Sequence, residues 1–82
     1  MPFTVTGTTS SSINTAVNKD LPTGYDASNC SLIGFSIQNK SNSNWYSNPN
    51  TVSVYLMSGK AYISVSENAW TSQSYKILIC PH

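Results

Sequence analysis

The segment TVSVYLMSGKAYISVS, residues 51–66, is the part of the chain that most restricts its fold. Apolar and polar side chains alternate on both sides of a Ser58–Gly59 pair. Because successive side chains of a β-strand point to opposite faces, this alternation predicts two strands with one buried face, and the glycine supplies the positive φ of a tight turn. A two-residue loop pairs Val52 with Val65, Val54 with Ile63, Leu56 with Ala61, Ser53 with Ser64, and Tyr55 with Tyr62. The first three pairs form an apolar face, so the turn and the pattern predict the same register.

The period of two continues along almost the whole chain, and no window has the apolar spacing of a helix. The predicted strands are Phe3–Thr8, Ile13–Lys19, Ser31–Gln38, Thr51–Met57, Lys60–Ser66 and Ser74–Cys80. Outside the hairpin, the predicted core consists of Phe3, Val5, Ile13, Val17, Ile33, Phe35, Ile37, Tyr75, Ile77 and Ile79. We therefore expect an all-β fold, a single domain over residues 1–82, built as a small antiparallel β-sandwich or partly closed barrel of about six strands.

The surface of such a domain must be built largely from hydroxyl and amide groups. Ser, Thr and Asn make up 32 of the 82 residues, whereas the chain has four lysines, three acidic residues and a net charge of +1. This composition gives no electrostatic reason to expect binding to nucleic acid or to an anionic membrane. It suits neutral ligands that form hydrogen bonds, or simply an uncharged surface.

The sequence has no segment that would insert into a membrane. No apolar stretch approaches the roughly 18–20 residues that span a bilayer, and the Met1–Phe3 start lacks the basic and apolar regions of a signal peptide. We therefore expect a soluble chain. It would act where it is synthesised, leave the cell by another route such as lysis, or be a piece of a longer protein.

The reversal of direction at each antiparallel connection predicts which loops share an end of the domain. One end receives the connections Thr9–Ser12, Asn39–Asn50 and Glu67–Gln73, and the other receives Asp20–Cys30, the Ser58–Gly59 turn and both termini. Trp45 and Tyr46 are therefore expected at the same end as Trp70.

These three aromatic residues are predicted to form a ligand-binding surface with nearby asparagines, namely Asn44, Asn48, Asn50 and Asn68. A flat indole stacks on the apolar C–H face of a sugar ring, while amides and a tyrosine hydroxyl bond to its hydroxyl groups. The alternative is that one or both tryptophans fold inward and close the open end of a small core. Adjacent residues of an extended chain point opposite ways, so at least one of Trp45 and Tyr46 should be exposed.

The sequence offers little for catalysis. His82 is the only histidine, and Asp20 and Asp26 are expected at the opposite end from Glu67. Turn chemistry accounts for the two aspartates, and the chain has no phosphate-binding loop, zinc spacing or calcium loop. We expect no enzyme activity, no metal and no cofactor.

The two cysteines, Cys30 and Cys80, open and close strands at the same end of the domain, so we expect them to be close in space. A disulfide between them would close a long loop and add about 3–5 kcal/mol of stability. Two free thiols are the alternative, which a reducing cytoplasm would favour.

From Leu21 to Cys80 the chain resembles the small β-structured tip domains at the C-terminus of bacteriophage tail fibres and related receptor-binding proteins. The resemblance rests on LPTGY, a strand ending in IGFSI, an Asn-rich loop, VSVYLMSGKAYISVSENAW and a closing YKILI. The chain departs from the family's pattern in DASNC, which separates GY from LIG widely, and in the final CPH. The resemblance implies a homotrimer on a virion fibre, which binds a bacterial surface glycan or a protein receptor.

The sequence leaves two other functions open. One is a structural virion protein, for example a decoration or fibre-assembly piece, whose aromatics pack between subunits. The other is a carbohydrate-binding domain of an enzyme. An apolar strip is predicted on the face away from the core, formed by Tyr55, Met57 and Tyr62. Either another copy of the chain or the second sheet of the sandwich would cover this strip.

Overall fold

The alternating segment around Ser58–Gly59 forms the predicted hairpin. In the computed structural model, which describes residues 1–82, strands β5 (Val52–Met57) and β6 (Lys60–Val65) pair in the predicted register. Both turn residues have positive φ, 52° for Ser58 and 71° for Gly59. Two positive φ values in a two-residue loop match the right-handed twist of the flanking strands, so the turn and the strands support each other.

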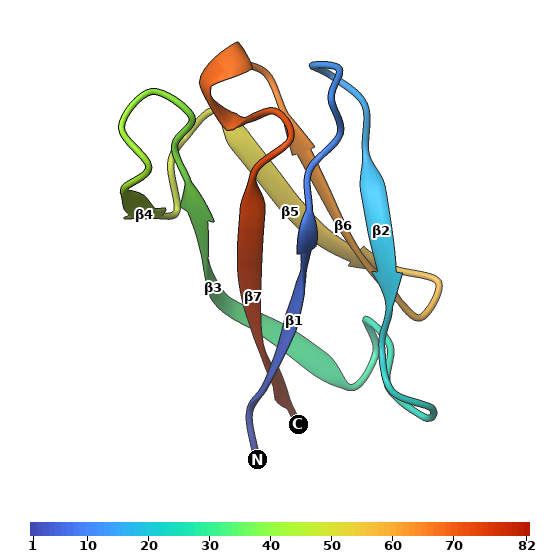
Figure 1. Ribbon diagram of the computed structural model, residues 1–82. Helices are drawn as coiled ribbons and strands as arrows, with labels where there is room; N and C mark the ends of the chain where they lie inside the picture. The colour runs from blue at the N-terminus through green and yellow to red at the C-terminus, as the bar shows by residue number, and fades with distance from the viewer.

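Two antiparallel sheets pack face to face around the core (Figure 1). The four-stranded sheet has the order β1-β7-β3-β4, and the three-stranded sheet has the order β2-β6-β5. The remaining strands are β1 (Phe3–Thr8), β2 (Val17–Asp20), β3 (Cys30–Gln38), β4 (Trp45–Ser47) and β7 (Ser74–Pro81), and one short 3-10 helix, η1, spans Asn68–Trp70. The predicted all-β, sandwich-like fold is confirmed.

The core lies between the inner faces of the two sheets. It contains the buried side chains of Val5, Leu21, Cys30, Ile37, Val52, Ala61, Ile63, Val65, Trp70, Tyr75, Ile77 and Ile79. Phe3, Val17 and Phe35 are partly buried against this cluster. Most of the predicted core is therefore confirmed, because the strand alternation places these residues on one face.

Two predicted core residues are exposed, and one strand was not predicted. Ile33 is 53% exposed because the pairing of β3 with β7 shifts between Leu32 and Gly34, and this β-bulge turns Ile33 out of the core. Ile13 is exposed because β2 begins only at Val17. The predicted loop 39–50 contains the short strand β4, which pairs with residues 36–38 of β3.

The predicted arrangement of the loops at the two ends is confirmed. Both termini, the loop after β2 and the Ser58–Gly59 turn lie at one end, called here the lower end, whereas η1 lies at the opposite, upper end (Figure 1). At the lower end Leu21 N donates to Gly59 O at 2.9 Å. At the upper end Lys40 N donates to Ala69 O at 2.8 Å.

Cys30 and Cys80 lie at the same end of the domain, as predicted, on the neighbouring strands β3 and β7, and both are free thiols. The register pairs Cys30 with Pro81 and Ser31 with Cys80. Because side chains alternate along a strand, this offset of one residue sends the two thiols to opposite faces of the sheet. The Cys30 thiol is buried in the core, and no bridge joins the pair.

The tyrosine strip lies on the outer face of the three-stranded sheet. Tyr55 and Tyr62 stack with their ring centroids 5.0 Å apart and their planes 2° apart. Tyr55 and Met57 are exposed. The second sheet packs on the other face, so it does not cover this strip. The structure contains no helix that is long and apolar enough to cross a membrane.

Gly7 provides a test of core packing. Gly7 pairs with Tyr75 across β1 and β7, and a Cβ at this position would lie 2.6 Å from Tyr75 Oη and 2.8 Å from Cζ. Burial raises the pKa of this hydroxyl, so it stays uncharged. We expect Gly7→Ala to lower the free energy of unfolding by about 1–3 kcal/mol, because the ring must move within a close-packed core. Urea denaturation followed by circular dichroism measures this change.

A second strand glycine is the matched control. A Cβ at Gly34 would meet nothing closer than 3.4 Å, so Gly34→Ala should change stability by less than about 0.5 kcal/mol. Tyr75→Phe removes Oη, the atom nearest to the added Cβ. Combined with Gly7→Ala, it should restore part of the lost stability. Equal stability of the two alanine variants would contradict this account of the core.

Candidate functional site

Strand β4 sends its two aromatic residues to different sides of the four-stranded sheet. Tyr46 pairs with the buried Ile37, whereas Trp45 pairs with Gln38. Side chains opposite each other in a pair share a face, so Tyr46 lies on the core side and Trp45 on the outer face. Both remain exposed, Trp45 at 45% and Tyr46 at 41%. The prediction that Trp45 and Tyr46 point in opposite directions is therefore confirmed, because both residues belong to the short strand β4.

Trp70 belongs to the core and not to an exposed surface. It is only 7% exposed, and its Nε1 donates a hydrogen bond to Thr51 Oγ1 at 2.9 Å. Tyr46 covers its edge, with the ring centroids 5.5 Å apart and the planes at 81°. The prediction that Trp70 presents a face to a ligand is therefore corrected, because η1 turns the ring inward, where it closes the upper end of the core.

A hydrogen-bond network holds this upper end closed. The buried Thr9 donates through Oγ1 to Trp70 O at 2.6 Å and accepts from Gln73 N at 3.0 Å. Lys40 Nζ donates to the hydroxyl of Thr71, which is also buried. The fold itself therefore uses these polar groups, which leaves few of them free for a ligand.

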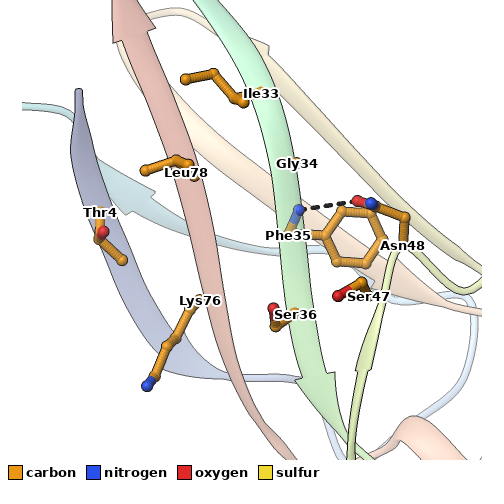
Figure 2. Close-up of a pocket in the computed structure, with 9 residues that line it drawn as sticks. All are labelled: Thr4, Ile33, Gly34, Phe35, Ser36, Ser47, Asn48, Lys76 and Leu78. Atoms are coloured by element: carbon orange, nitrogen blue, oxygen red, sulfur yellow. Dashed lines mark hydrogen bonds between the residues drawn. The ribbon is translucent and has the colours of Figure 1, made fainter.

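The four predicted asparagines have different surroundings. Asn48, with φ of 50°, donates through its backbone N to Phe35 O at 3.0 Å, and its Oδ1 accepts from Phe35 N at 2.9 Å (Figure 2). This side chain thus extends the edge pairing beside the β-bulge. Asn68 accepts from Thr71 Oγ1 at 2.9 Å through its carbonyl oxygen. Asn44 and Asn50 are exposed near the upper end.

An open depression of about 340 Å³ lies on the outer face of the four-stranded sheet (Figure 2). It is lined by Thr4 of β1, Lys76 and Leu78 of β7, residues 33–36 of β3, Ser47 of β4, and Asn48. A smaller depression of about 230 Å³ continues around the β-bulge, where Leu32 and Val54 join the lining. The larger volume is at the lower end of the roughly 300–1,000 Å³ typical of small-molecule sites.

Lys76 connects this depression to Trp45. Its Nζ lies 5.1 Å from the centroid of the Trp45 ring, within the range of a cation–π contact. At an exposed position such a contact contributes about 0.5–1 kcal/mol. Two of the predicted residues, Trp45 and Asn48, therefore belong to one candidate site, which also contains Lys76, Ser36 and Ser47. Tyr46 and Trp70 lie apart from it, in contact with each other at the upper end.

Sequence reasoning missed Lys76, Ser36 and Ser47. Each occupies a polar position in an alternating strand, which indicates an outward direction but not which residues meet across the sheet. Only the register, which pairs Ser36 with Lys76 on one side and with Ser47 on the other, brings them together.

The aspartates are bonded locally, at a distance from this depression. A hydrogen bond and the charge of Lys60 hold the pKa of Asp20 below its usual value. Hydrogen bonds from the hydroxyl and backbone N–H of Ser28 lower the pKa of Asp26 in the same way. Both groups are therefore ionised at neutral pH, whereas a general acid needs a raised pKa. No group of three or more His, Cys, Asp or Glu side chains is placed to hold a metal ion.

No family model matches the chain, and no curated protein or solved structure matches it either. The geometry of the residues themselves is therefore the basis for assigning a function.

The two tryptophans should differ sharply in their contribution to stability. We expect Trp70→Ala to lower the free energy of unfolding by about 3–5 kcal/mol, because it empties a large volume in the core and leaves Thr51 without its partner. Trp45→Ala should cost less than about 1 kcal/mol, since it removes an exposed ring and one cation–π contact. Urea denaturation of the two variants measures both values, and similar losses would contradict the placement of the two rings.

Proposed function

We propose that the chain is a non-enzymatic recognition module that binds a saccharide on the outer face of its four-stranded sheet. The resemblance to tail-fibre tips implies a bacterial surface glycan or a protein receptor as the natural target, and of these we propose the glycan. The observation that carries the proposal is the exposed Trp45 beside a depression whose lining combines the apolar side chains of Ile33, Phe35 and Leu78 with hydroxyl and amide groups.

The chemistry of the depression suits a sugar ring. Trp45 offers an apolar surface for the C–H face of a pyranose, and an aromatic ring of this kind loses little conformational freedom on binding. Ser36, Ser47 and the Asn48 amide can donate to and accept from sugar hydroxyls. Because Asn48 is already fixed by its bonds to Phe35, its side chain is preorganised, which reduces the cost of ordering it in a complex.

The titratable groups give no support to a catalytic alternative. The two aspartates have lowered pKa values, and neither lines the depression. His82 Nε2 is hydrogen-bonded to Ser31 Oγ at the lower end, which is far along the sheet from Trp45. A recognition role uses the residues that are present without requiring a general acid or a nucleophile.

The placement of the termini supports attachment as a fibre tip. Met1 and His82 both lie at the lower end, whereas β4 lies toward the upper end (Figure 1). A shaft joined at Met1 would therefore leave β4 and Trp45 toward the end away from the shaft, with the depression on the side of the domain.

Binding measurements on single variants test the proposal. We expect Trp45→Ala to reduce binding to a glycan array and to a panel of bacterial cells by about tenfold or more, with a melting temperature close to that of the parent chain. Tyr46→Ala should lose less binding, because Tyr46 lies on the other side of the sheet. Tyr25→Ala, which removes an exposed ring at the lower end, is the matched control and should bind as the parent does. Undiminished binding by Trp45→Ala would rule out this site.

A structural virion protein is the second candidate, and the strip of Tyr55, Met57 and Tyr62 favours it. An exposed apolar strip on a small domain is a typical subunit interface. We propose that copies of the chain associate through this strip, as a homotrimer, whichever of the two functions holds. A trimer that binds no glycan and no cell would favour the structural function.

Light scattering tests the association directly. We expect a mass about three times the 8.9 kDa of one chain at micromolar concentration. Replacing Tyr55 and Met57 together with serine should return the mass to that of a monomer without unfolding it, because both side chains are exposed. A monomer mass for the parent chain would exclude the trimer.

A further inference from the structure

Lys76 is the only charged side chain that lines the depression on the four-stranded sheet. The single salt bridge of the protein joins Lys60 to Asp20 and leaves Lys76 without a carboxylate partner. Asp26 lies in the lower loop, and Glu67 lies at the upper end beside η1. The positive charge of Lys76 is therefore not neutralised by any nearby acidic residue, although the chain as a whole carries a net charge of only +1.

The register surrounds this charge with neutral hydrogen-bonding groups. Lys76, Ser36 and Ser47 are direct neighbours across β7, β3 and β4, so they form a row on the outer face. Gly34, two residues before Ser36 on the same face of β3, has no side chain and leaves the floor beside this row open. Lysine also has a flexible four-carbon stem, which allows its ammonium to move between the Trp45 ring and a ligand.

A ligand that contacts both Trp45 and the depression lies next to the Lys76 side chain. This side chain lines the depression, and its Nζ lies 5.1 Å from the centroid of the Trp45 ring. A neutral sugar that stacks on the face of the ring held by the ammonium would displace it without replacing its contact. A sugar that carries an anionic group would replace an exposed cation–π contact by a charge-assisted hydrogen bond, which is the stronger of the two interactions.

We propose that this depression selects saccharides with an anionic substituent, such as the carboxylate of a uronic or sialic acid or the phosphate of a sugar phosphate. Lys76 binds the anionic group of the sugar. Ser36 and Ser47 form hydrogen bonds with hydroxyls of the same sugar unit, and Trp45 contacts the sugar ring. This inference rests on the proposed function, since it names the class of saccharide that the same site would take.

Titration of the 15N-labelled full chain at constant ionic strength tests the inference, with chemical shifts as the readout. The probes are glucose, glucuronic acid, glucose 6-phosphate and, as a control for the anion alone, inorganic phosphate. We expect glucuronic acid or glucose 6-phosphate to bind about tenfold more tightly than glucose, and to shift the amide signals of residues 34–36, 47–48 and 76. The two acidic probes distinguish a carboxylate from a phosphate as the preferred anion. A second series at higher salt concentration should show weaker binding of the acidic sugars and unchanged binding of glucose.

Variants of one lysine at a time provide the controls. Lys76→Gln should bring the affinity for the acidic sugars down to that for glucose, and Lys76→Arg should restore most of the difference. Lys19→Gln makes the same change of charge on β2, in the other sheet, and should bind as the parent does.

The possible failures separate the two proposals. Equal affinities for glucose and both acidic sugars, with shifts at the depression, would overturn the selection of anions and leave the recognition function in place. Equal shifts with inorganic phosphate and with the sugar acids would also overturn it, because the site would then bind an anion without a sugar. No shift at the depression with any sugar would overturn both proposals.

Discussion

The burial of one face of β7 is the constraint on which the rest of the structure depends. Tyr75, Ile77 and Ile79 are almost fully buried, and β7 pairs with β1 on one side and β3 on the other. Burying each large side chain contributes about 1.5–3 kcal/mol, which is substantial beside the roughly 5–15 kcal/mol of net stability that a domain has. Because the inner face is fixed in this way, Lys76 and Leu78 are fixed outward, and the depression follows from the core.

Local signals in the sequence were sufficient for the hairpin and insufficient for β3. In the hairpin, the turn residues and the alternation act within one short segment, so the register of Val54 with Ile63 could be predicted. In β3, the alternation of Ile33, Phe35 and Ile37 looks uninterrupted, and the β-bulge that expels Ile33 arises from pairing with β7 more than forty residues later. A bulge of this kind depends on two strands at once, and neither strand contains it alone.

The candidate site was only partly predictable for the same reason. Composition and the reversal of strands placed Trp45, Tyr46 and Trp70 at one end of the domain, and the contact between Tyr46 and Trp70 agrees with that. Which of Trp45 and Tyr46 would lie on the outer face depended on a three-residue strand, β4, that has too few residues for a recognisable pattern. Lys76 became part of the site only through its register with Ser36, which sequence periodicity does not contain.

The opposite placement of the two tryptophans gives the protein two separate optical reporters. Trp70 sits in an apolar surrounding with its Nε1 bonded to Thr51, whereas Trp45 is in contact with solvent and with the ammonium of Lys76. Indole emission shifts to longer wavelength in water, so the two residues emit in different parts of the spectrum. The short-wavelength component follows the integrity of the core, and the long-wavelength component follows events at the outer face. A shift of the Trp70 emission to longer wavelength therefore reports loss of folding, and a change in the Trp45 emission without that shift reports occupation of the surface, in one unlabelled sample.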